Sequence, residues 1–166
     1  LYNNTPKHRD NFLKLVKENS YNGSRFHRVI GDFMIQGGEI DGINHTLPAE
    51  IKQGLYHKKG ALAAARQPDK VNQERQSSGS QFFLVEGKIY STRQLKRIER
   101  SKDFSYTDEQ IKTYTSIGGA PNLDGEYTVF GEVVMGLQIL ERISKVKTDK
   151  NDSPVKPVER DIKRLE

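Results

Sequence analysis

Residues 26–38 constrain the fold of this chain more than any other stretch. They hold two short runs of mostly apolar, β-forming residues, broken by Gly31-Asp32 and ended by two glycines. This pattern predicts a β-hairpin. Arg28 lies in the middle of the first run, where the alternation of side chains places it among apolar neighbours on one face. A permanent charge at such a position needs an explanation.

The length of the hairpin loop decides what Arg28 faces, because loop length sets the register of a hairpin. A two-residue turn places Arg28 opposite Ile35, whereas a three-residue loop that includes Phe33 places it opposite Gln36. In the second case Arg28, Met34 and Gln36 share one face of the hairpin. The alternative interpretation is an edge strand whose arginine reaches into water, with its aliphatic stem lying on apolar neighbours.

Three segments, in order along the chain, resemble one known family. The hairpin, with Phe-His-Arg-Val-Ile followed by Phe-Met-Ile-Gln-Gly-Gly, closely resembles the signature of the cyclophilin family of peptidyl-prolyl isomerases. Residues 79–85 and 122–133 resemble the second and third hallmark segments of that family, and residues 48–50 resemble its bacterial members. The resemblance implies a mainly β fold, a closed antiparallel β-barrel capped by two α-helices. It also implies that the chain is truncated at its N-terminus.

Length and charge limit the other possibilities. The 166 residues suffice for one domain with a core, so we expect a single domain over 1–166. The net charge is +5, but basic residues are interspersed with acidic ones, which argues against dedicated nucleic-acid binding. No apolar run is long enough to span a membrane, and the four histidines lack metal-ligand spacing. The absence of cysteine and the start at Leu1 leave the compartment, cytoplasmic or periplasmic, undetermined.

Local patterns predict the remaining elements. A helix should begin with Thr5 as N-cap and Pro6 in its first turn, and should end near Gly23. The alanine-rich residues 61–66 favour a helix by propensity, but the resemblance implies a strand whose small side chains let a substrate backbone approach. Further predictions are a loop at 67–78, strands at 79–85, 127–134 and 158–166, and a helix at 137–144.

The strand at 79–85 should alternate, with one face carrying Gln81, Phe83 and Val85 and the other carrying Phe82 and Leu84.

Residues 88–118 have no counterpart in the minimal family pattern, so we expect a helical insertion. Leu95 and Ile98 mark a first short helix, and Thr107 with Gln110 predicts a capping box for a second. Basic residues crowd the first helix: Arg93, Lys96, Arg97, Arg100 and Lys102. They form either a solvated face or a docking surface for an acidic partner, and the sequence leaves both interpretations open.

The chemistry implied by the resemblance is rotation about the peptide bond that precedes proline, in proline-containing peptides and unfolded proteins. The unaided barrier is about 18–20 kcal/mol, because the C–N bond has partial double-bond character. Rotation forms no covalent bond, so no metal or cofactor is expected. In the twisted transition state the prolyl nitrogen regains a lone pair, which a guanidinium is suited to hydrogen-bond. Arg28 is therefore the predicted catalytic group, with Gln36 orienting it and contacting the substrate backbone.

Other site residues follow from the resemblance, position by position. An apolar pocket for the proline ring would be formed by Phe33, Met34, Phe83 and Leu123. The groove for the preceding residues would be lined by Ala65, Arg66 and Gln81. For each apolar residue taken alone, the alternative is an ordinary place in the barrel core.

Asn122 and Tyr127, in the third hallmark segment, are also predicted to bind the substrate, but both depart from common family patterns. Tyr127 stands where many eukaryotic members carry histidine. Asn122 stands where tryptophan or histidine contacts the cyclic-peptide inhibitor of the family, so we expect weak inhibitor affinity. The predicted function is peptidyl-prolyl cis-trans isomerase activity that assists protein folding. The alternative is a non-catalytic module that binds proline peptides.

Overall fold

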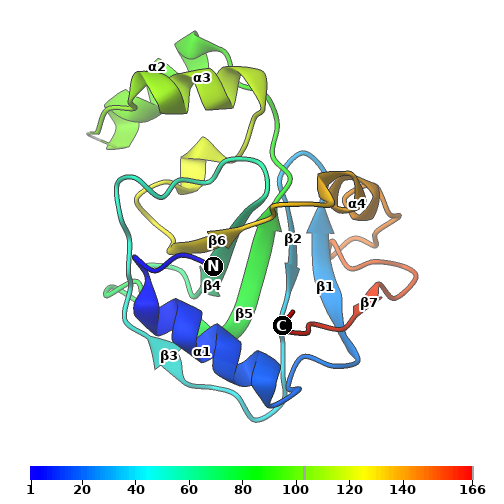
Figure 1. Cartoon of the computed structure of the whole chain (residues 1–166). Coiled ribbons are helices and arrows are strands. Elements are labelled where there is room, and N and C mark those ends of the chain that lie inside the picture. The colour runs from blue at the N-terminus through cyan, green and yellow to red at the C-terminus, as the bar shows by residue number, and fades with distance from the viewer. Residues whose placement is uncertain (103, 166) are drawn as a thin grey trace.

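The computed structural model describes residues 1–102 and 104–165, and Figure 1 shows its elements. Seven antiparallel strands form one sheet in the order β6-β4-β5-β2-β1-β7, with β3 paired to β5. The strands are β1 (Ser24–Ile30), β2 (Met34–Gly37), β3 (Thr46–Leu47), β4 (Ala61–Arg66), β5 (Ser77–Val85), β6 (Val129–Glu132) and β7 (Glu159–Arg160). The helices are α1 (Pro6–Lys17), α2 (Thr92–Lys102), α3 (Asp108–Ser116) and α4 (Leu137–Ile143), with the 3-10 turn η1 (Pro121–Leu123).

The mainly β, antiparallel fold is confirmed, whereas closure of the barrel is not. The hydrogen-bonded path runs from β6 to β7, and within the described residues these two edge strands do not pair with each other. Helices α2 and α3 lie together above η1, away from the helices that cover the sheet (Figure 1). A closed barrel therefore stays a prediction.

The hairpin register follows the three-residue alternative. Arg28 lies opposite Gln36 and Ile30 lies opposite Met34, so the loop consists of residues 31–33. The buried Glu86 carboxylate accepts the backbone N–H of Asp32 at 2.5 Å, which holds the loop against β5. Because Phe33 belongs to this loop, its position is fixed beside the face that carries Arg28.

The alanine-rich residues 61–66 form strand β4, as the resemblance implied and against helix propensity. β4 is hydrogen-bonded on one side to β5 and on the other to β6. Ala63 and Ala64 lie opposite Phe83 and Phe82, and every residue from 61 to 65 is buried. A central strand with both faces covered leaves room only for small side chains, and its pairing on two sides outweighs the weak preference of alanine for helix.

Helix α1 ends earlier than predicted, at Lys17 rather than near Gly23. Asn19 adopts a left-handed conformation with φ of 56°. The Ser20 N–H donates to the Leu15 carbonyl at 3.0 Å, and the Asn19 N–H donates to the Val16 carbonyl at 3.1 Å. This is the Schellman arrangement, in which asparagine replaces the usual glycine.

The N-terminus of α1 is capped from elsewhere in the chain. Thr5 occupies the N-cap position, as predicted, but its side chain makes no capping hydrogen bond. The Glu50 carboxylate instead accepts the backbone N–H groups of Lys7 at 3.2 Å and His8 at 3.0 Å. A carboxylate at this end also interacts favourably with the helix dipole.

Several predicted elements were too long. The strand at 127–134 is limited to Val129–Glu132, and the loop at 67–78 ends at residue 76 because the next two residues pair with β3. The strand at 158–166 reduces to Glu159–Arg160, which pairs only with the first two residues of β1. A strand needs a neighbour to pair with, and within the described residues no strand pairs with 161–165. Residue 166 lies outside them.

The two faces of the sheet carry different cores. One core packs α1 and α4 onto the sheet and includes Phe82, Phe130 and Leu140. The other includes Met34 and Phe83 and lies on the opposite face. This confirms the predicted alternation along β5.

Within the described residues, no helix is long and apolar enough to cross a membrane.

Candidate active site

A cavity of about 180 Å³ lies between the hairpin, β4, β5 and the segment that follows η1. Nine of the predicted site residues line it: Arg28, Phe33, Met34, Gln36, Ala65, Arg66, Phe83, Leu123 and Tyr127. We call it the proline pocket, after the role predicted for these residues. The structure thus brings together residues from four separate stretches of the chain, which the pairing of β2, β4 and β5 holds side by side.

The floor of the proline pocket is a stack of rings. Phe83 is buried, and its ring lies parallel to that of His57, with centroids 5.9 Å apart and planes at 10°. Tyr127 packs edge-on against Phe83 at 5.7 Å. Aromatic contacts of this geometry stabilise fixed ring positions. The pocket therefore presents a preformed apolar surface.

Arg28 lies at the rim, with its side chain 44% exposed. Its Nε atom is 3.5 Å from a carboxylate oxygen of Asp152, in the segment after α4. The Asp152 carbonyl also accepts the backbone N–H of Val29 at 2.8 Å, so this segment is tied to β1. Sequence reasoning missed Asp152, because no motif or spacing marks a residue so distant in the chain.

Gln36 lies opposite Arg28 in the hairpin, but its described side-chain hydrogen bond goes elsewhere. The Gln36 amide donates to the Gln81 amide oxygen at 3.1 Å. Gln81 is in turn held by its backbone N–H, which donates to the Ser78 hydroxyl at 3.1 Å. The predicted orientation of Arg28 by Gln36 stays a prediction.

Arg66 ties the pocket to the loop of residues 67–76. Its Nε donates to the Glu126 carbonyl at 2.8 Å, and its guanidinium lies over the Tyr127 ring, 4.6 Å from the centroid. An ion pair at 2.5 Å joins it to Asp69. The Arg66 guanidinium lowers the pKa of the Asp69 carboxyl below its usual value. Arg66 is thus held on three sides and fixes Tyr127 in the pocket wall.

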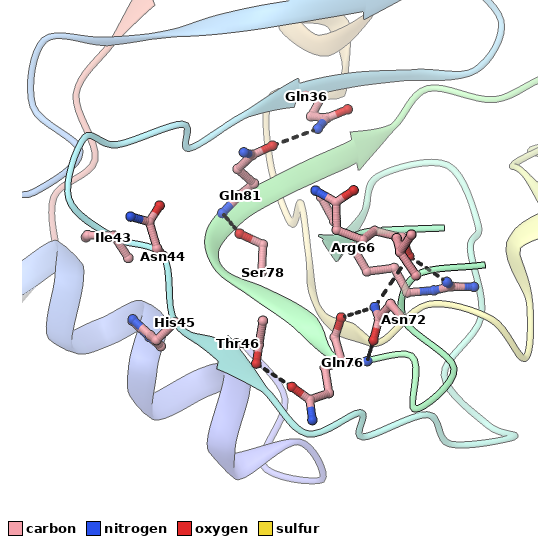
Figure 2. A pocket seen from close by; sticks show the side chains of 13 residues that line it. Gln36, Ile43, Asn44, His45, Thr46, Arg66, Asn72, Gln76, Ser78 and Gln81 are labelled. Carbon is pink, nitrogen blue, oxygen red and sulfur yellow. Dashed lines mark hydrogen bonds between the residues drawn. The ribbon is translucent and has the colours of Figure 1, made fainter. Parts of the chain in front are cut away.

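A second cavity, of about 490 Å³, adjoins the proline pocket, and Figure 2 shows its lining. Gln36, Ala65 and Arg66 line both cavities, so the two are continuous. The rest of the lining is mostly polar and comes from β3, β5, the loop of residues 67–76 and the segment before β3: Ile43, Asn44, His45, Thr46, Gln67, Val71, Asn72, Gln76, Ser78 and Gln81. We call it the polar cavity.

Side chains within the polar cavity are held by one another. Thr46 hydrogen-bonds the Gln76 side chain, and the Asn72 amide oxygen accepts the Gln76 backbone N–H at 2.9 Å (Figure 2). Gln81, predicted for the groove before the proline, lies here rather than in the proline pocket. Asn122 lies in neither cavity and is exposed.

Comparison with known proteins identifies the family to which this chain belongs. An apolar pocket beside a guanidinium can bind an apolar group of a peptide, and rotation about a peptide bond requires no nucleophile. The family model of the cyclophilin type peptidyl-prolyl cis-trans isomerases matches residues 1–164. The chain belongs to this family. The predicted family, enzyme class and isomerase function are thereby confirmed.

Two curated relatives from bacteria agree with the resemblance of residues 48–50 to bacterial members of the family. A Staphylococcus aureus protein named as a peptidyl-prolyl cis-trans isomerase is 32% identical over 164 residues, which cover 94% of this chain and 79% of that protein. A Streptococcus pyogenes protein named as a bifunctional phosphatase/peptidyl-prolyl cis-trans isomerase is 36% identical over 165 residues. That match covers 92% of this chain but only 33% of the streptococcal protein.

Solved structures support the same fold. A cyclophilin type peptidyl-prolyl cis-trans isomerase of Cryptosporidium parvum superposes with a TM-score of 0.70 at 25% identity, covering 95% of this chain and 83% of that one. A second structure of that protein was determined in the presence of the dipeptide Ala-Pro, and it superposes with a TM-score of 0.68 at 24% identity, covering 95% and 84%.

Proposed function

We propose that this chain isomerises Xaa-Pro bonds by holding the proline ring in the proline pocket while Arg28 stabilises the twisted amide. The observation that supports the proposal is the single 180 Å³ cavity in which a guanidinium meets Phe33, Met34, Phe83 and Leu123. The apolar surface binds the ring, and the guanidinium donates to the prolyl nitrogen once its lone pair is free. The substrates we propose are proline-containing peptides and unfolded proteins.

The contribution of Arg28 to the acceleration of the reaction can be estimated. A hydrogen bond from a charged donor contributes about 1.5–3 kcal/mol, which corresponds to a rate factor of roughly 10 to 100. The remainder of the acceleration would come from the pocket, which excludes water from one side of the amide and fixes the ring. Gln36 and Gln81 would bind the substrate backbone, since both carry amide groups at the junction of the two cavities.

The test is exchange NMR on an Ala-Pro peptide with the wild-type chain and with Arg28→Ala. We expect the wild type to accelerate cis/trans exchange and Arg28→Ala to lose roughly ten- to a hundredfold in kcat/KM. The matched control is Arg25→Ala, an exposed arginine on the same strand that lines neither cavity. A folded wild type that binds the peptide without accelerating exchange would instead identify a non-catalytic proline-peptide binding module.

A second role is favoured by the outer face of α2. Arg93, Lys96, Arg97 and Arg100 are all exposed and follow the spacing i, i+3, i+4, i+7, so they form one basic stripe opposite the buried Leu95. We propose that residues 88–118 are an insertion in a single domain and that the basic stripe binds an acidic peptide segment.

Titration of a poly-glutamate peptide at two salt concentrations tests the basic stripe. We expect binding that weakens with salt and is lost in the double variant Arg93→Gln, Arg97→Gln. The matched double variant on α1, Lys14→Gln with Lys17→Gln, should keep it. Equal binding by both double variants would show a nonspecific effect of net charge.

A further inference from the structure

One wall of the proline pocket lies outside the sheet. Leu123 belongs to η1 and Tyr127 follows the turn at residues 124–126, whereas the opposite walls belong to the paired strands β2, β4 and β5. Strand residues are fixed by ladder hydrogen bonds on both sides. The segment of residues 121–127, here called the wall segment, depends on side chains from elsewhere for its position.

Helix α2 holds the wall segment through its last residue. The Lys102 ammonium donates to the Asn122 carbonyl at 2.5 Å and to the Asp124 carbonyl at 3.0 Å. It also forms an ion pair with the Glu126 carboxylate at 2.6 Å, with the lysine side chain only 17% exposed. All three donors of one ammonium are therefore used on a stretch of five residues that contains Leu123.

Helix α3 holds the same segment from inside the protein. The Tyr114 hydroxyl donates to one carboxylate oxygen of Asp124 at 2.5 Å, and the Tyr106 hydroxyl, just before α3, donates to the Pro121 carbonyl at 3.1 Å. Both tyrosines are buried, and burial raises the pKa of each hydroxyl well above its usual range. They therefore act as neutral donors at physiological pH.

The contact continues from Asp124 to the pocket floor. The other carboxylate oxygen of Asp124 accepts the backbone N–H of His57 and lies 2.8 Å from its Nδ1 atom. The His57 ring then stacks on Phe83. A continuous chain of contacts thus runs from α3 through Asp124 and His57 to the ring that forms the floor.

We propose that α2 and α3 act as a brace for the proline pocket, with Lys102 and Tyr114 as positioning residues that set the wall segment and, through Asp124 and His57, the floor. Neither residue lines the pocket, so both act through others. The proposal deepens the isomerase function proposed above and rests on it. It also assigns a role to the helical segment that is independent of the basic stripe, which lies on the exposed face of α2.

The first variant is Lys102→Met, which keeps an unbranched chain of similar length and removes the ammonium. We expect kcat/KM for the Ala-Pro peptide to fall roughly three- to tenfold. A displacement of about 1 Å can lower a rate about a hundredfold, and a pocket wall displaced by a fraction of an ångström should lower it by less. The matched control is Lys112→Met, an exposed lysine on α3 that makes no described side-chain contact with the wall segment.

The second variant is Tyr114→Phe, which removes one hydroxyl and leaves the ring packed on Tyr56 and Tyr106. Its control is Tyr56→Phe, which removes the hydroxyl that donates to Thr113 of the same helix but does not contact the wall segment. Methyl NMR of Leu123, recorded well below the unfolding midpoint, supplies a readout that general loss of stability would not move.

The outcomes separate the proposals. The brace is supported if Lys102→Met and Tyr114→Phe lower kcat/KM and shift or broaden the Leu123 methyl signals, while the two controls match the wild type. It is overturned if the variants lower the unfolding midpoint like their controls and leave kcat/KM and the Leu123 signals unchanged. An inactive wild type would instead reject the isomerase function, because the brace predicts only differences from an active one.

Discussion

The proline pocket and the polar cavity share three residues yet differ in nearly every physical respect. The proline pocket is the smaller, about 180 Å³ against about 490 Å³, and its walls are rings, a thioether and a leucine, together with the guanidinium groups of Arg28 and Arg66. The polar cavity is lined mainly by amides and hydroxyls that hydrogen-bond one another. A fixed apolar surface suits one invariant ring, whereas amides and hydroxyls can pair with many peptide groups.

This difference suggests a division of labour along the bound peptide. The proline pocket would perform the rotation for any sequence, and the polar cavity would hold the residues before the proline. Variants on the two sides should therefore differ in which peptides they affect, and each prediction below tests that separation.

The largest effect on the free energy of unfolding is expected at Phe83 and Phe82, which lie on opposite faces of the sheet. Truncating either buried ring to alanine should lower the free energy of unfolding by about 3–5 kcal/mol, measured by urea denaturation. For activity, the milder changes Phe83→Leu and Phe82→Leu keep the chain folded. We expect about a tenfold loss of kcat/KM for Phe83→Leu, because the ring contacts with His57 and Tyr127 disappear.

Phe82→Leu should leave activity near the wild-type level, since Phe82 belongs to the core under α1. Equal losses of kcat/KM in the two leucine variants would mean that activity follows stability rather than the shape of the proline pocket.

The sequence predicted most of this geometry where local rules apply. Alternation along residues 79–85 placed Phe83 and Phe82 on opposite faces, and the hairpin pattern brought Arg28 opposite Gln36 as one of two registers. The capping box of Thr107 and Gln110 is present in α3. Each of these depends on spacing within a few residues, which a sequence displays directly.

Residues that act across the fold could not be predicted in the same way. Asp152 pairs with Arg28, Glu50 caps α1, and Asp124 links Tyr114 to His57, so each contact joins different elements of the fold. Such contacts depend on the whole topology, so no local pattern marks them. The end of α1 at Lys17 was missed because glycine was expected to stop the helix, whereas Asn19 takes the left-handed conformation here.

A smaller effect is expected for Gln81→Leu, which removes the hydrogen bond to Gln36 at the junction of the cavities. The loss of a neutral hydrogen bond should raise KM roughly two- to tenfold. We expect this rise for peptides that extend several residues before the proline, and little change for the dipeptide Ala-Pro. Arg28→Ala, by contrast, should lower kcat/KM for both lengths. The division of labour is wrong if Gln81→Leu affects short and long peptides equally.

The smallest effect concerns Asp69, whose ion pair with Arg66 fixes a residue common to both cavities. Hydrogen bonding to Arg66 lowers the pKa of this carboxyl below its ordinary value of 3.8. A carboxyl with a lowered folded-state pKa contributes its full stabilisation above the ordinary value and loses it as the pH falls through the lowered one. The contribution is small because Asp69 is 54% exposed and solvent screens the pair.

An NMR titration of the Asp69 carboxyl measures this directly. We expect a midpoint below 3.8 in the wild type and a higher midpoint in Arg66→Gln, where only the pairing with Arg75 at 3.2 Å remains. Because Arg66 also holds Tyr127, the same variant should weaken peptide binding at neutral pH, whereas Asp69→Asn should weaken it less. An unchanged midpoint in Arg66→Gln would show that the Arg66 ion pair does not hold the boundary between the two cavities.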